Sequence, residues 1–232
     1  MPKIHVNLIA DEHYPLMKDV ERKTKRELKE KPTKEAKWLM EYTQKHIKKQ
    51  EYGLEYRKKT MEKEKCDAVL VELIPNAVKE LLKDLLNEKK RYPDMLKGKP
   101  ELEVAQKRKI PIIPIEREKE DYEFDEADAE HYALFVKKRR GEPITEKQIN
   151  KVKKRIEKLA KKREAYHSKM IIQIGKKIAK EKGRPARLRV ILGEAHITPV
   201  KRRIETKMGK GIRVEVKNLE YQRTRGKPVL RR

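Results

Sequence analysis

The sequence predicts an α/β fold with a mostly parallel central sheet, flanking helices and a long helical excursion. Short apolar runs alternate along the chain with longer amphipathic patterns, which is the order that parallel strands with helical crossovers require. A second observation is a motif that occurs twice: residues 4–13 and 189–196 each read as a buried strand followed by a tight turn with an acid and a histidine. With 232 residues, one core is the simplest arrangement.

The first half of the chain begins with the apolar run 4–9, which predicts a strand. A helix follows the first turn, and a long helical excursion then covers residues 32–65, with Gly53 as the position that favours an interruption. The run 66–73 is apolar, short and rich in β-branched residues, so it predicts a second buried strand. Pro75 opens the next helix.

In the second half, the run 110–115 is apolar but contains two prolines, which place it at the edge of a sheet. Helices are predicted from about 125 to 140 and from 145 to 182. The strand 188–192 and its motif come next, with Pro199 read as the start of a helix. The alternating strand 212–216 follows.

These elements predict one α/β domain over residues 1–218, with helical insertions near 32–65 and 145–182 that could pair as an arm. Residues 219–232 are basic and poor in core residues, a composition that favours a disordered tail.

The composition is dominated by charge: 63 Lys and Arg stand against 38 Asp and Glu, a net charge of +25, and only 36% of residues are hydrophobic. Abundant lysine and glutamate with few aromatics resemble the surfaces of hyperthermophile proteins. The positive field attracts polyanions, so nucleic acid is a candidate partner, although aromatic RNA-reading motifs are absent. Cys66 alone excludes a disulfide framework and a cysteine-based zinc ribbon. The sequence shows neither a membrane span nor a signal peptide, so we expect a cytoplasmic protein without a membrane partner.

Candidate functional residues lie where the predicted strands end. Four turns carry such groups: Glu12-His13, Glu72, Arg117 and Glu194-His196. If the strands are parallel, these turns share one edge of the sheet. Two histidines with carboxylates suit zinc, manganese or a similar divalent ion, which lowers the pKa of bound water while a glutamate acts as general base. Without a metal, Glu and His can share acid–base work beside an arginine. In the alternative interpretation, Glu12 and Glu194 have no catalytic role and only complement the positive ends of helix dipoles.

Outside these turns, Arg163, His167 and Met170 share one helical face, because they are spaced four and three residues apart. The plainest interpretation is a helix surface on which Met170 starts the apolar stripe.

The ordered motifs resemble those of the TraB/TIKI proteins and their erythromycin-esterase and ChaN relatives. The stretches that carry the resemblance are Ala10-Asp11-Glu12-His13, Val69-Leu70-Val71-Glu72-Leu73, Arg163 with Met170, and Gly193-Glu194-Ala195-His196. The resemblance implies a divalent-metal-dependent hydrolase with His13, Glu72, Arg163 and His196 at its centre. Two departures, Ala10 in place of a glycine and Thr198-Pro199 after the second motif, leave open a member that has lost catalysis.

The leading hypothesis is therefore a metal-dependent hydrolase of unknown substrate. Its catalytic residues would be Glu72, Arg163 and Glu194, and its metal ligands would be His13, His196 and Glu12. One alternative is a basic nucleic-acid-binding protein of archaeal or mobile-element origin. Another is an inactive scaffold whose long helices form a homodimer, in which case the apolar stripe of 145–182 should be exposed in the monomer.

Overall fold

The central element of the protein, in a computed structural model, is a five-stranded sheet of order β3-β2-β4-β1-β5, and every pair of neighbouring strands is parallel. The predicted α/β class is confirmed. The strands are β1 (Ile4–Asp11), β2 (Ala68–Val71), β3 (Ile112–Pro114), β4 (Ala186–Gly193) and β5 (Ile212–Lys217). The structure describes residues 3–11, 17–30, 32–79, 99–208, 212–217, 221–224 and 227–230.

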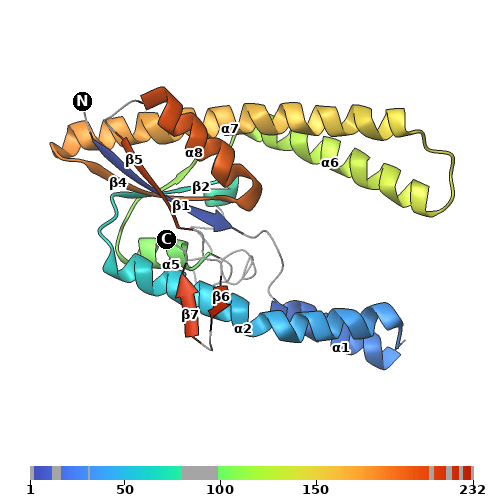
Figure 1. The fold of residues 1–232 in the computed structure, drawn as a ribbon. Coiled ribbons are helices and arrows are strands. Elements are labelled where there is room, and N and C mark those ends of the chain that lie inside the picture. Colours follow the sequence, from blue (N-terminus) through green and yellow to red (C-terminus); the bar gives the residue numbers. More distant parts are fainter. Residues whose placement is uncertain are drawn as a thin grey trace.

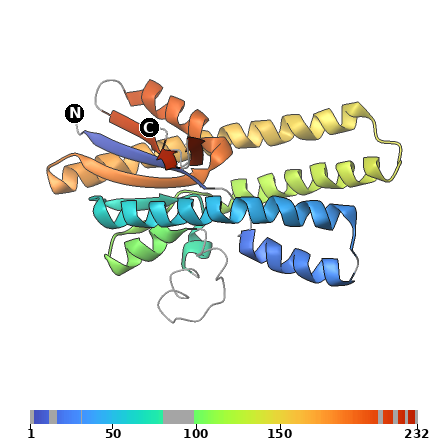
Figure 2. The same cartoon turned by 60° about the horizontal axis from the view of Figure 1, so that its bottom comes forward.

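Helices cover both faces of the sheet, as Figures 1 and 2 show. On one face, α7 (Glu146–Lys182) and α8 (Glu194–Met208) pack against the strands, and α6 (Glu118–Arg139) packs against α7. On the other face lie α2 (Lys34–Lys63) and α5 (Pro100–Lys107), and α1 (Met17–Glu30) packs against α2. The pairs α1–α2 and α6–α7 extend beyond the sheet as two helical hairpins (Figure 1). The two predicted insertions thus pair mainly with other helices, not with each other.

Alternation along the strands builds the two halves of the core. Ile4, Val6 and Leu8 of β1 belong to the large apolar cluster under α7 and α8. Side chains that point to the other side of the sheet, such as Ile191 of β4, belong to a smaller cluster under α2 and α5. Because successive residues of a strand face opposite sides, the parity of a residue decides which helical layer it meets.

The structure agrees with some of the predicted details of these elements and differs from others for identifiable reasons. The strand β3 lies at the sheet edge, as its prolines predicted. The helix α2 runs through Gly53 without a break, because tertiary packing on its buried side outweighs the low helix propensity of one glycine. The helix α6 begins at Glu118, where an acidic first turn complements the helix dipole. Similarly, α8 begins at Glu194 directly after β4, so Pro199 lies inside the helix and does not start it.

Capping side chains fix the starts of the two long helices. The hydroxyl oxygen of Thr33 accepts a hydrogen bond from the Ala36 N–H at 3.1 Å. Thr145 forms a reciprocal capping box with Gln148 at the start of α7.

The basic tail contains two short strands, β6 (Tyr221–Thr224) and β7 (Lys227–Leu230), which pair antiparallel and apart from the main sheet. None of the described helices has the length and apolarity needed to cross a membrane.

Candidate active site

The carboxyl edge of the sheet brings together side chains that follow three different strands. Glu72 comes directly after β2, Glu116 follows β3 by two residues, and His196 lies in the first turn of α8 after β4. All three residues are buried, with exposed fractions of 6%, 3% and 8%. Parallel strands end at the same edge, so residues far apart in sequence meet there, as predicted for Glu72 and His196.

Helix α7 adds three more buried polar side chains from above this edge. Arg163, Glu164 and His167 are 7%, 8% and 0% exposed. Arg163 and His167 are four residues apart, so they project from one face of the helix toward the strand ends.

Arg163 joins the two strand-end carboxylates. Its Nη2 donates to Glu72 Oε1 at 3.0 Å and to Glu116 Oε2 at 2.7 Å, and its Nε donates to Glu116 Oε2 at 3.0 Å. The other oxygen of Glu72 accepts the Gly193 N–H at 2.6 Å. Both oxygens of Glu72 are therefore held in place, one by α7 and one by the last residue of β4.

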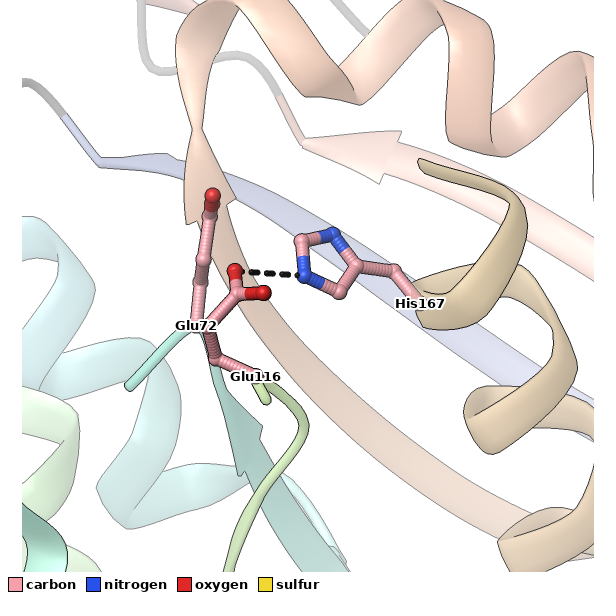
Figure 3. A group of neighbouring side chains, drawn as sticks. All are labelled: Glu72, Glu116 and His167. Carbon is pink, nitrogen blue, oxygen red and sulfur yellow. Dashed lines mark hydrogen bonds and ion pairs between the residues drawn. The ribbon is translucent and has the colours of Figure 1, made fainter. Parts of the chain in front are cut away.

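His167 completes a cluster with the same two carboxylates (Figure 3). Its Nε2 lies 2.9 Å from Glu116 Oε2. Its Nδ1 is buried and has no hydrogen-bond partner within the described part of the chain. An unpaired buried nitrogen costs free energy, so the ring has a reason to be there beyond packing.

His196 lies between two carboxylates without a close hydrogen bond to either. Its Nε2 is 3.5 Å from Glu72 Oε1, and its Nδ1 is 3.5 Å from Glu164 Oε1. Glu164 in turn lies near Arg203, whose Nε is 3.7 Å from Glu164 Oε2. The centres of the two imidazole rings, His167 and His196, are 6.0 Å apart.

Charge in the cluster is set by opposing effects. Burial would raise the pKa of Glu116, but hydrogen bonds from His167 and Arg163 outweigh it and lower that pKa. Asp121, 3.6 Å from Arg163, has a raised pKa because burial dominates there. Because its pKa is lowered, the Glu116 carboxyl group is an anion at neutral pH. The Arg163 guanidinium also lies over the Phe124 ring, 4.6 Å from its centre.

The cluster has the donor atoms of a divalent-metal site. Glu72, Glu116 and His167 each offer one ligand atom, and these atoms lie within 4.8 Å of one another. Two carboxylate oxygens and one imidazole nitrogen suit zinc, manganese or a related ion. Glu116 Oε2 already takes hydrogen bonds from Arg163 and His167. Glu116 Oε1 accepts the Arg117 N–H at 3.2 Å and has a second lone pair that can bind an ion. The residues present therefore fit a metal ion in their chemistry.

The predicted site residues divide into three groups. Glu72, Arg163 and His196 lie together. Glu194 is exposed at the start of α8, and Arg117 is exposed and lies over the Tyr166 ring, 3.9 Å from its centre. Glu12 and His13 lie outside the described residues, although β1 leads toward the same edge, with Asp11 opposite Gly193 in the ladder.

Sequence reasoning missed Glu116, Glu164 and His167. The sequence pattern places His167 on a helix surface, but the structure shows it fully buried. Its spacing of four residues from Arg163 was the available indication. Glu116 follows an apolar strand just as Glu72 does, and that parallel could have identified it.

Comparisons with models of protein families, with curated proteins and with solved structures gave no match. The resemblance to the TraB/TIKI proteins therefore rests on the sequence motifs.

Proposed function

We propose that this protein is a hydrolase of the TraB/TIKI-like type, with its active site at the carboxyl edge of the sheet. The observation that carries the proposal is the buried group formed by Glu72, Glu116, Arg163, His167 and His196. Burying several ionisable groups is costly unless they are paired, and such clusters gather at functional sites.

In the leading form of this proposal, a divalent ion binds to Glu72, Glu116 and His167. When bound, the ion would supply Lewis acidity and lower the pKa of a water molecule. Arg163 positions both carboxylates, because it donates to each of them. His196 is the acid–base group: it lies between Glu72 and Glu164 and is almost fully buried, whereas Glu194 is exposed. The sequence hypothesis that Glu12 and His13 add further metal ligands is part of this proposal.

The position of Arg163 favours a second form, a hydrolase without a metal. The guanidinium already pairs with both carboxylates and cancels one of their two negative charges, which weakens their attraction for a cation. In this form His196 activates the attacking water, the Glu164 carboxylate 3.5 Å from Nδ1 stabilises the imidazolium that forms, and the positive field of Arg163 stabilises the oxyanion.

Metal binding separates the two forms. Equilibrium dialysis of metal-free protein against Zn²⁺ or Mn²⁺, followed by elemental analysis, should show one bound ion. The variants Glu116→Gln and His167→Ala should each weaken binding by about tenfold or more, because each loses a ligand. Glu157→Gln on an exposed position of α7 is the matched control and should bind like the wild type. Absence of binding by the wild type, or equal binding by all four proteins, contradicts the metal form.

Activity is measured on p-nitrophenyl acetate and on a fluorogenic peptide, with and without the added ion. His196→Ala should abolish turnover in either form while the circular-dichroism melting curve stays close to that of the wild type. Turnover that survives in His196→Ala would contradict the hydrolase proposal itself.

Nucleic-acid binding is the second candidate function, and a specific surface favours it. Exposed lysines line a hollow on α7, namely Lys154, Lys158, Lys161 and Lys162, beside Glu157. Affinity for duplex DNA should then fall with salt with a log–log slope of about −0.9 per phosphate contact. A flat salt response would remove this candidate.

The inactive-scaffold alternative loses its main support. It required an exposed apolar stripe on residues 145–182, but Val152 and Leu159 of α7 are 4% and 6% exposed. Ile171 and Ile172 lie in the core under the sheet-facing side of the helix.

A further inference from the structure

A second polar site lies on the opposite face of the sheet from α7 and α8, near the start of β4. It is a cavity of about 260 Å³ between β1, β4, β5 and the end of α2. Arg189 shares its strand face with Ile191, whose side chain packs in the cluster under α2 and α5. The proposed active site is at the carboxyl edge and on the other face, so the two sites are separate.

The ladder of the sheet gathers cations at this cavity. His5 of β1 lies opposite Arg187 of β4 on one side and Arg213 of β5 on the other. One step further along, Asn7 lies opposite Arg189. All of these residues line the cavity.

The formal charge of the lining is strongly positive. Lys65, Arg187, Arg189 and Arg213 contribute four positive charges and Glu64 one negative charge, which leaves +3 with His5 neutral. Glu64 also accepts a hydrogen bond from Asn7 Nδ2 at 3.2 Å.

Arg189 is the buried centre of this group. It is 3% exposed, and its Nε and Nη1 have no hydrogen-bond partner among the described residues. A second nearby carboxylate, Glu101, is engaged by Arg57 through two hydrogen bonds of 2.6 and 2.8 Å. Burial lowers the pKa of Arg189, although Glu101 and Glu64 oppose the effect. A buried guanidinium whose N–H groups are unpaired, in a cavity of net positive charge, is expected to have an anionic partner.

We propose that this cavity binds the phosphate group of a small phosphorylated ligand, with Arg189 as the central donor. The guanidinium fork matches phosphate oxygens in geometry, and it is less strongly hydrated than an ammonium group. The cavity is slightly smaller than the range of roughly 300–1,000 Å³ typical of drug-sized ligands. A phosphate with a short organic group fits this volume. Arg187 and Arg213 at the mouth attract the anion, and Arg189 holds it.

Titration calorimetry with inorganic phosphate at 150 mM NaCl tests the proposal. Arg189→Met, which replaces the guanidinium by a shorter, unbranched apolar side chain and so removes its charge and donors, should weaken phosphate binding by about tenfold or more. Arg202→Met removes the same group from an exposed position of α8 and should bind phosphate like the wild type. Phosphate should also raise the melting temperature of the wild type and of Arg202→Met, but not of Arg189→Met. Equal phosphate affinity in all three proteins overturns the proposal.

Folding of the variant is checked by circular dichroism. Arg189→Met should fold, because it removes a buried charge that lacks partners. Should it nevertheless misfold, Arg187→Met serves in its place: Arg187 is exposed at the mouth of the cavity, and its loss should weaken phosphate binding several-fold. Unchanged binding in that folded variant would also overturn the proposal.

A competition experiment distinguishes a small phosphorylated ligand from a nucleic-acid backbone as the source of the phosphate. A ten-nucleotide single-stranded DNA with a 5′-phosphate should compete with inorganic phosphate, whereas the same DNA without that group should not. If the unphosphorylated DNA displaces phosphate and loses this ability in Arg189→Met, the cavity binds a nucleic-acid backbone and the small-ligand proposal is refuted.

Discussion

Replacing Asp67 by asparagine should lower the stability of the protein at neutral pH and leave it almost unchanged in strong acid. Asp67 precedes β2 and is bonded to the end of α7 and to the start of β4. Its carboxylate accepts hydrogen bonds from Lys182 Nζ at 2.7 Å, from Arg184 Nη2 and Nη1 at 2.6 and 3.0 Å, and from the Arg187 N–H at 2.9 Å. The side chain is 3% exposed.

The magnitude follows from the pKa of this carboxyl group. Burial by itself would raise the pKa of Asp67, but the hydrogen bonds from Arg184, Lys182 and the Arg187 N–H outweigh it and lower the pKa from 3.8 to about 2. At about 1.4 kcal/mol per pKa unit, this corresponds to roughly 2 kcal/mol of stability. Lys182 and Arg184 are each 45% exposed, so water screens part of the interaction, and we expect about 1–2 kcal/mol.

The sign of the pH dependence is fixed by the direction of this shift. A carboxyl group whose pKa is lower in the folded state stabilises that state fully above pH 3.8, and the contribution is lost as the pH falls toward 2. Urea unfolding of the wild type and Asp67→Asn should therefore differ by about 1–2 kcal/mol at pH 7 and converge near pH 2.

Asp128→Asn, which removes the same charge from an exposed position of α6, is the control and should follow the wild type at every pH. If the difference between Asp67→Asn and the wild type is the same at pH 7 and pH 2, the electrostatic reasoning is refuted.

Three further changes test the packing and capping of the fold by urea unfolding. Glu101→Ala removes the carboxylate that Arg57 bonds inside the protein and should cost about 3–5 kcal/mol. Arg57→Met with Glu101→Leu removes both charges and should cost clearly less, and equal losses would contradict this. Gly175→Ala should destabilise by about 1–3 kcal/mol despite the better helix propensity of alanine, because the new Cβ would lie 2.8 Å from two carbons of Ile4. A neutral or stabilising effect would show that α7 and β1 can move apart without loss of packing. Thr145→Ala removes the acceptor of the capping box of α7 and should cost about 1 kcal/mol, while Thr145→Ser should cost little.

The sequence by itself determined the class of the fold and most of its strands. Apolar runs of four to eight residues bounded by polar segments have few other stable arrangements. Pro111, just before β3, and Pro114, at its end, disfavour a place for this strand at the centre of the sheet. Because parallel strands end at a common edge, the sequence also anticipated that Glu72 and His196 would meet.

Only the tertiary structure decided which other residues join them. His167 and Glu116 are 51 positions apart in the chain, and their contact depends on where α7 crosses the sheet and which of its faces turns inward. Helical periodicity shows that Arg163 and His167 share a face, but it does not show what that face meets. The orientation of a helix on a sheet is set by the summed packing of many side chains from distant elements, and a local pattern does not contain that sum. The cation-lined cavity around Arg189 arises in the same way, from the pairing of β4, β1 and β5.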